Sequence, residues 1–244
     1  EIYFVSNQSN RPITITPTFR VSRRLLPEFW NPLDGSIRTL HDYELTDSGT
    51  KISLELDALG SGFVVFRVEP SVNILSSEYS VHPVRCEEIR SEWDVSFDGK
   101  LSNPNDITMS KLRDLSTIKE NDIRYFSGTI NYTTEIEPKF NKERVVLDFS
   151  KVECMAKVYI NDEFAGGVWC EPYKVDITKR LQPGVNTLRV EVVNKWVNRI
   201  VGDMQLPEQE RKISLTANPY NANSKIPSSG LIGPVRLEYY ARLP

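Results

Sequence analysis

The stretch VECMAKVYINDEFAGGVWCEPYKVDITKRLQPGVNTLRVEVVNKWVN, residues 152–198, decides the fold. Its first strand alternates apolar and polar side chains, with Ala156, Val158 and Ile160 on one face. That is the period of a strand with one buried face. The pair Asn161-Asp162 follows, and both residue types tolerate the positive φ of a tight hairpin turn. Antiparallel strands joined by such turns predict a sandwich whose apolar faces point inward.

A second turn and a second strand complete this pattern. The turn at residues 182–184, Gln-Pro-Gly, combines a proline that presets φ with a glycine that accepts a positive φ, which suits a type II turn. The strand after it is the most regular in the chain, with Leu188, Val190 and Val192 on one face. The two strands therefore predict one antiparallel sheet with a single buried face.

Similar alternation lies on both sides of this stretch. Segments with one apolar face occur at residues 93–97, 130–136, 145–149 and 235–239. Together with the strands above they amount to about eight, the number typical of a jelly roll. One short helical turn is expected around residues 109–115. The connection from residue 195 to residue 232 has little periodicity, and so long a connection is usually functional or packed by its own side chains.

The chain divides into two predicted domains, both all-β. Residues 1–70 predict a small β-sandwich accessory domain, in which Pro17 indicates an edge position or a bulge. GSGFVVFRVE, residues 60–69, is apolar on both faces and predicts a central strand. Residues 71–90 lose the alternation and are rich in serine, which predicts a linker or a crossing strand. Residues 91–244 then form the jelly-roll domain.

The charge balance excludes two classes of partner. The chain has 30 basic and 33 acidic residues, a formal net charge of −3, and no long run of either sign. A nucleic-acid-binding surface needs a basic stripe, and a membrane span needs a long apolar run, so neither partner is expected. The chain begins with Glu1 and shows no signal-peptide pattern. We therefore expect it to be a segment of a longer protein.

The cysteine and histidine inventory argues against a metal or cofactor. The three cysteines have no CxxC spacing and the chain has only two histidines, so a zinc site is not expected. Cys154 and Cys170 flank neighbouring predicted strands, which leaves two alternatives: a disulfide, or two buried free thiols, the alternative that the sequence favours. A structural calcium ion is compatible with a sandwich of this kind, but no DxDxDG-type loop gives it a position. We expect no cofactor and no metal site.

Three quoted segments carry a family resemblance. The order V…A.VYIN…GG.W..PY.VDIT..L.PG.NTL.V.V.N resembles the sugar-binding jelly-roll domain of family 2 glycoside hydrolases. The later segments NKWVNRIVGDMQLPEQER and SSGLIGPVRLEY resemble the C-terminal region of glycoside hydrolase family 106, the α-L-rhamnosidase-like enzymes. Within them, residues 196–203 resemble the family element W-x-N-R-L-I-G-D, with Ile200-Val201 in place of Leu-Ile. The resemblance covers roughly residues 93–239 and is weaker before them.

The resemblance implies a galactose-binding-like β-sandwich attached to a glycosidase. In the resembled enzymes the catalytic acids belong to a preceding barrel, so the implied partner is a catalytic domain of the same polypeptide upstream of Glu1. A plant or host glycan is the other implied partner, and the implied location is the periplasm or the extracellular space of a bacterium.

Candidate sugar-binding residues are aromatic platforms and polar side chains in the predicted loops. Pyranose rings stack their apolar faces on aromatic rings, while Asn, Asp and Arg form directional hydrogen bonds to hydroxyl groups. The candidates are Trp169, Tyr173, Trp196, Asn198, Arg199 and Asp203.

A structural role is the alternative for each of these residues. Trp169 would then cap the core and Tyr173 would pack beneath the turn at Pro183, since aromatic residues dominate core energetics. Arg199 and Asp203 are four residues apart, so they are expected to pair across one turn and to hold the loop in shape. Exposed Trp169 and Trp196 on one rim would favour a binding module, and burial of both would favour a structural spacer.

No catalytic residues are expected in this chain. Glycoside hydrolysis usually needs two carboxyl groups on opposite sides of the scissile bond. Asp148, Glu191 and Glu238 alternate with apolar strand residues and are expected to face solvent. The residues therefore predict no active site, and the resemblance implies a non-catalytic C-terminal segment of an α-L-rhamnosidase-like glycoside hydrolase that buttresses the catalytic domain and contacts glycan. The alternatives are an autonomous carbohydrate-binding module and a purely structural β-sandwich spacer.

Overall fold

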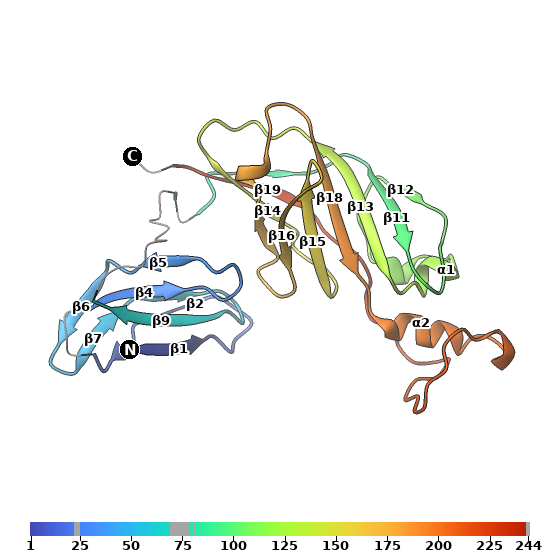
Figure 1. Ribbon diagram of the computed structural model, residues 1–244, viewed down its shortest axis with the longest axis horizontal. Helices are drawn as coiled ribbons and strands as arrows, with labels where there is room; N and C mark the ends of the chain where they lie inside the picture. Colours follow the sequence, from blue (N-terminus) through green and yellow to red (C-terminus); the bar gives the residue numbers. More distant parts are fainter. Residues whose placement is uncertain (22–24, 69–78, 81, 243–244) are drawn as a thin grey trace. The chain divides into compact units, whose positions relative to one another are not determined.

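The computed structural model describes residues 1–21, 25–68, 79–80 and 82–242, and it contains two compact units (Figure 1). The first unit comprises Glu1–Val81 with Arg242–Pro244, and the second comprises His82–Ala241. Both are built of strands, so the all-β class with two β-sandwich domains is confirmed. The predicted domain limits at residues 70 and 91 remain a prediction, because much of the intervening stretch lies outside the described residues.

The first unit consists of short antiparallel strands. They are β1 (Ile2–Ser6), β2 (Ile13–Ile15), β3 (Thr18–Phe19), β4 (Leu26–Trp30), β5 (Ile37–Thr39), β6 (Tyr43–Thr46), β7 (Gly49–Ile52), β8 (Leu54–Leu56) and β9 (Ser61–Arg67). As predicted, β9 is central and pairs with β1 and β4. Pro17, predicted at an edge position or a bulge, lies between β2 and β3. Phe19, Val64 and Phe66 belong to the core of this unit.

The second unit is a sandwich of two antiparallel sheets. Its strands are β10 (Arg85–Glu88), β11 (Trp93–Asp98), β12 (Ile107–Met109), β13 (Thr129–Ile136), β14 (Arg144–Asp148), β15 (Met155–Ile160), β16 (Glu163–Val168), β17 (Lys174–Asp176), β18 (Asn186–Val193) and β19 (Arg236–Tyr240). One sheet has the order β12-β11-β13-β18-β15-β16 and the other β10-β19-β14-β17. The described strands exceed the predicted eight, partly because β10 lies within the stretch predicted as a linker or crossing strand.

The predicted strand faces and turns of the organising stretch are confirmed. The inward side chains of β15 and β18 are buried in one core cluster with those of β13 and β19. Asn161 and Asp162 both have positive φ, 51° and 65°, and they join β15 to β16. Gly184 has φ 89°, as the turn before β18 requires. The jelly-roll prediction was correct because the inward positions carry mostly apolar side chains, with Thr134 and Asn186 as buried polar exceptions.

Short helices interrupt the strands of the second unit. They are η1 (Leu115–Thr117), α1 (Asn121–Arg124), η2 (Thr178–Arg180), α2 (Trp196–Asp203) and η3 (Glu208–Glu210). The helical turn predicted around residues 109–115 was wrong in position, because Met109 ends a strand and the helical turns begin at Leu115. No helix among the described residues is long and apolar enough to span a membrane.

Glu238 corrects the expectation that strand carboxylates face solvent. Its side chain is buried, although it lies on the outer face of β19. The ammonium of Lys174 donates to both carboxylate oxygens at 3.0 and 2.8 Å, and the Tyr240 hydroxyl donates at 2.7 Å. Lys174 reaches this carboxylate from β17, which lies beyond β14 in the sheet, and Tyr240 follows it on β19 itself. Asp148 and Glu191 are only partly exposed.

The structure distinguishes between the two alternatives for Cys154 and Cys170, a disulfide or two buried free thiols. All three cysteines are free, so the structure contains no Cys154–Cys170 disulfide. Neither thiol is fully buried, however, since Cys154 and Cys170 are both half-buried and Cys86 is exposed. Burial, reinforced by the charge of Glu171, raises the pKa of the Cys170 thiol.

The connection that leads into β19 is tied to the sandwich by hydrogen bonds from the backbone of residues 229–231. The N–H of Leu231 donates to the Tyr132 hydroxyl at 3.1 Å. Gly230 has φ 86°, and a Cβ at this position would lie 2.2 Å from the Tyr132 oxygen, so only glycine fits. The N–H of Ser229 donates to a carboxylate oxygen of Asp114 at 2.9 Å, and the same oxygen accepts from the N–H of Ser116.

Tyr132→Phe should destabilise the second unit. The substitution leaves the buried N–H of Leu231 without its acceptor, and such an orphaned donor costs about 1–3 kcal/mol. Urea unfolding of the full chain measures the change. Tyr159→Phe is the matched control, because the Tyr159 hydroxyl has no hydrogen-bond partner in the described part of the chain. Equal stability of the two variants would contradict the role of the Tyr132 hydroxyl.

Asp114→Asn should change how stability depends on pH. Burial opposes ionisation of Asp114, but hydrogen bonds from Ser116 and Ser229 outweigh it and hold its pKa below the usual value. A carboxylate with a depressed folded-state pKa stabilises the fold above its unfolded pKa of about 3.9, and this contribution is lost as pH falls through the folded pKa. The stability difference between wild type and variant should therefore shrink on acidification. A difference that stays constant in denaturant titrations from neutral pH to about pH 2 would refute this assignment.

Candidate functional site

The most distinctive element outside the sandwich core is an excursion that begins where β18 ends. Figure 1 shows α2 and the loop after it projecting beyond the ends of the strands. Inside α2 the Arg199 guanidinium pairs with the carboxylate of Asp203, as the four-residue spacing predicted. Their side chains are 7% and 0% exposed, so the pair is buried rather than a surface ion pair.

Asp203 also ties α2 to the returning chain. Its second carboxylate oxygen accepts the backbone N–H groups of Lys212 and Ile213, both at 2.8 Å. Asn198, which is fully buried, donates its side-chain amide to the carbonyl of Pro227 at 3.1 Å. Three of the six predicted sugar-binding residues therefore point inward and hold the excursion in shape, and their side chains are not available to a ligand from solvent.

The same excursion packs on α1 through a glycine. A Cβ at Gly202 would lie 2.5 Å from the Cβ of Tyr125, so the close approach of the two helices requires this residue. The motif at residues 196–203 thus contains a buried ion pair, a buried amide and a contact glycine. All three serve the position of the helix.

Trp196 has a different environment from the rest of its motif. Its side chain is 62% exposed and lies at the start of α2. It borders a largely apolar groove of about 450 Å³. The groove is lined by Leu101, Trp196, Ile200, Lys212, Ile213, Ser214 and Leu215. We call this the α2 groove.

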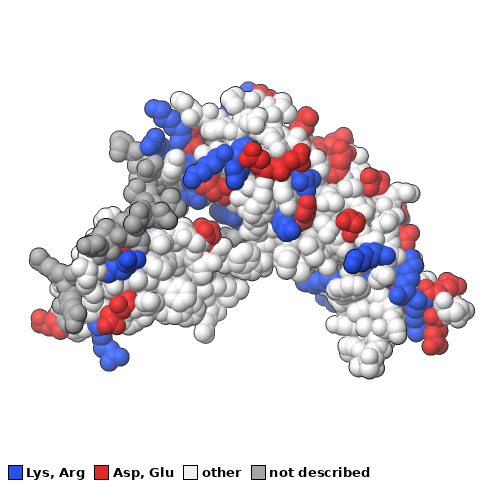
Figure 2. Space-filling model, in the orientation of Figure 1, with Lys and Arg blue, Asp and Glu red and all other residues white. Residues whose placement is uncertain are grey.

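The tip of the excursion carries no formal charge. Residues 213–224 contain no Lys, Arg, Asp or Glu, and Figure 2 shows an uncharged surface below α2. Leu215 and Tyr220 on this tip are 41% and 38% exposed. Apolar and aromatic side chains that are exposed together and free of charge indicate a contact surface.

Trp169 and Tyr173 lie on the connection from β16 to β17. Trp169 is 55% exposed, whereas Tyr173 is half-buried and packs against the core cluster. Burial first, and then the charges of Glu171 and Glu153, raise the pKa of Tyr173. The alternative role for Trp169, capping of the core, does not fit its exposure just after the end of β16.

The two groups of predicted residues share one end of the six-stranded sheet. Lys195, which precedes Trp196, pairs with Glu153 at 3.2 Å, and the charge of Glu153 also acts on Tyr173. The exposed tryptophans therefore stand on the same rim, the arrangement that favours a contact or binding role over a spacer. The six residues do not converge on one pocket, however, and Trp196 alone among them lines the α2 groove.

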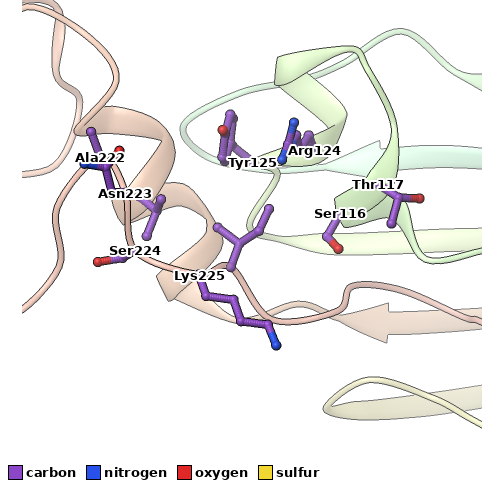
Figure 3. Close-up of a pocket in the computed structure, with 10 residues that line it drawn as sticks. Ser116, Thr117, Arg124, Tyr125, Ala222, Asn223, Ser224 and Lys225 are labelled. Atoms are coloured by element: carbon purple, nitrogen blue, oxygen red, sulfur yellow. The ribbon is translucent and has the colours of Figure 1, made fainter.

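A second, more polar pocket of about 580 Å³ lies on the other side of α2. Figure 3 shows Arg124 and Tyr125 from α1 facing Asn223 and Ser224 on the returning loop. Lys225 extends away from Arg124, so the two cations do not converge. Sequence reasoning missed this pocket because its walls come from segments about 100 residues apart without periodicity.

The chemistry available in these pockets is limited. Neither pocket is lined by Asp or Glu, the residues that glycoside hydrolysis requires in a pair. Among the described residues, no group of three His, Cys, Asp or Glu side chains is placed to hold a metal ion. The arrangement suits contact through aromatic and apolar surface.

Asp203→Ala should destabilise the excursion strongly. Removal of one partner of a buried pair leaves an uncompensated charge and costs about 3–5 kcal/mol. The loss should exceed that of Glu163→Ala, a matched control whose exposed pair with Arg180 contributes at most about 1 kcal/mol. Denaturant unfolding together with hydrogen exchange over residues 196–213 checks both. Equal effects of the two changes would contradict a structural role for the buried pair.

Comparisons with known proteins agree with this architecture. Residues 106–225 match the family model described as glycosyl hydrolase 2 galactose-binding domain-like. The structure of a rhamnosidase from Novosphingobium sp. PP1Y superposes with a TM-score of 0.82 and 32% sequence identity, over 98% of this chain and 22% of that one. A protein of Formosa agariphila that bears the name "Putative beta-glucuronidase" is 31% identical over 172 aligned residues, and the match covers 59% of this chain and 15% of that protein.

The chain thus spans about a fifth of the rhamnosidase and less of the Formosa protein. The expected resemblance to both a family 2 sugar-binding domain and rhamnosidase-like enzymes is confirmed. Residues 106–225 resemble the glycosyl hydrolase 2 galactose-binding-like domains, and the chain as a whole is similar to part of a rhamnosidase.

Proposed function

We propose that this chain is a non-catalytic accessory part of a larger glycoside hydrolase and that it contacts the catalytic part through the α2 excursion. The observation that carries the proposal is the α2 groove beside the exposed Trp196. Buried groups hold this groove rigidly at the end of the sandwich. The size of the relatives supports the proposal, because the matched region is a small share of each of them.

The composition of the excursion supports a protein partner. Centres of protein interfaces are enriched in aromatic residues and depleted of charge. Trp196, Ile200 and Leu215 meet that description, and Lys212 is the one charged residue that lines the groove. The Lys212 ammonium donates to the carbonyl of Leu101 at 2.7 Å, so its charge is partly satisfied within the chain.

The buried ion pair supports a role beyond folding of the sandwich. A buried pair stabilises a fold only weakly compared with apolar side chains of similar volume. What Arg199 and Asp203 contribute is a defined position for α2 and for the segment that returns from it. A rigid platform lowers the entropic cost of binding a partner, which is the advantage expected of a docking surface.

A carbohydrate-binding module is the second candidate. The exposure of Trp169 and Trp196 on one rim favours it over a spacer, since aromatic rings held in solvent are available for stacking. The two candidates are compatible, because the two rings belong to different surfaces. Trp196 borders the α2 groove, whereas Trp169 continues β16.

The proposal predicts that this chain alone hydrolyses no glycoside. The purified chain is assayed against aryl α-L-rhamnoside, β-galactoside and β-glucuronide, beside the complete protein that contains it. Turnover is expected only from the complete protein. Turnover by the chain that survives repurification, and that is lost on substitution of one of its carboxylates, would refute the non-catalytic role.

The docking surface is tested in the complete protein. Trp196→Ala should lower its thermal stability, because an aromatic anchor in an interface contributes on the order of 2 kcal/mol or more. The isolated chain, in which this ring is already exposed, should change little. Val185→Ala is the matched control, since Val185 is 59% exposed and precedes the opposite end of β18. Equal effects of Trp196→Ala on the chain and on the complete protein would contradict docking at the α2 groove.

A further inference from the structure

The outer face of the six-stranded sheet carries an ordered set of side chains that the fold does not explain. The register places Phe164, Tyr159 and Arg189 in one row across β16, β15 and β18. The next outward row is Gly167, Lys157 and Glu191. Trp169 follows Val168, the partner of Ala156, so it continues the row of Met155 and Val193. We call the strip from Phe164 to Trp169 the aromatic lane.

Both ends of the lane are exposed aromatic rings. Phe164 is 53% exposed and Trp169 is 55% exposed. Phe164 meets the Tyr159 ring edge-on with centroids 5.6 Å apart, and the Arg189 guanidinium stacks over Tyr159 at 4.0 Å. These contacts hold the Phe164 end in place without covering it.

The middle of the lane is flat. Gly166 and Gly167 lie between the two aromatic rings, and an added Cβ would meet different surroundings at each of them. A Cβ at Gly166 would meet the core residue Val175 at 2.8 Å, so this glycine serves internal packing. A Cβ at Gly167 would have one neighbour within 4 Å, the carbonyl of Ala156 at 3.1 Å, and would otherwise project from the outer face. Gly167 therefore leaves open surface between the two rings.

Polar groups border this flat middle. Lys157, the register partner of Gly167, has no hydrogen bond or ion pair among the residues that the structure describes. Glu191 lies beside it and pairs with Arg189. The outward side chain of Asn131 continues the same row on β13. Donors and acceptors therefore stand beside the open surface, between two apolar rings.

This composition fits a carbohydrate better than a protein. Centres of protein interfaces are depleted of Lys and Glu, whereas here Lys157 and Glu191 occupy the middle row. A pyranose ring has an apolar C–H face for an aromatic ring and hydroxyl groups around its edge for polar side chains. The aromatic lane offers both, with the rings on and just after β16 and the polar side chains beside them on β15 and β18.

We propose that the aromatic lane on the outer face of β16, β15 and β18 binds an extended oligosaccharide. Trp169 and Phe164 would carry its pyranose rings at the two ends, Gly167 would let it lie against the sheet, and Lys157 would bind a hydroxyl or carboxylate group of the sugar between them. This site is separate from the α2 groove and does not depend on the docking role.

The test uses the intact chain and two sets of oligosaccharides, one neutral and one containing uronic acid, in titration calorimetry. Trp169→Ala and Phe164→Ala should each weaken binding about tenfold or more. Gly167→Thr, a strand-compatible residue that projects into the lane, should do the same. Val185→Ala should leave the affinity unchanged, and thermal unfolding of each variant checks that it is folded.

Lys157→Gln separates the two sugar chemistries. A loss confined to the uronic-acid set would show that Lys157 meets a carboxylate, and an equal modest loss for both sets would show that it meets a hydroxyl. No binding of either set by the intact chain would overturn the proposal. Binding that Trp169→Ala and Phe164→Ala leave unchanged would overturn it equally. Neither result would bear on docking at the α2 groove, which Trp196→Ala tests in the complete protein.

Discussion

Strict alternation of side chains along β13, β18 and β15 is the constraint on which the second unit depends. Most inward positions on these strands contribute an apolar side chain to one buried core. Because the period is two, the same register also decides which side chains remain outside, and a slip of one residue would exchange the two sets. The core and the aromatic lane are therefore two consequences of one register. Lys157 and Tyr159 are outside because Ala156, Val158 and Ile160 are inside.

The α2 excursion depends on a different kind of interaction. It lacks a continuous apolar core of its own and is held instead by polar contacts: the Arg199–Asp203 pair, the two backbone N–H groups on Asp203, and the amide of Asn198. Such contacts contribute modestly to net stability but fix geometry, since each has one satisfactory arrangement. A surface that must present Trp196 at a constant place benefits from this rigidity. Rigid position and an exposed ring together are what the proposed accessory role requires.

Much of the fold could be predicted from the sequence. The features that could not be predicted depend on contacts between strands rather than on neighbours in the chain. Local patterns were sufficient for the strands, for the Asn161-Asp162 turn and for the pairing of Arg199 with Asp203, because each involves neighbours in the chain. They failed where burial comes from partners distant in sequence. Glu238 was expected in solvent but is covered by Lys174 and Tyr240. Trp169, for which capping of the core was one of two alternatives, is exposed. Phe164 was overlooked because its significance depends on the β16–β15 register.

Hydrogen exchange over residues 196–224 tests the central claim most directly, namely that the α2 excursion is a preformed surface for the catalytic part of a larger glycoside hydrolase. The amides of residues 214–224 lie on an exposed loop in the chain by itself, so they should exchange rapidly there. In the complete protein the account predicts marked protection of these amides and of the start of α2, with the strands of the sandwich unchanged. Exchange of this loop that is equally rapid in both proteins would contradict the claim.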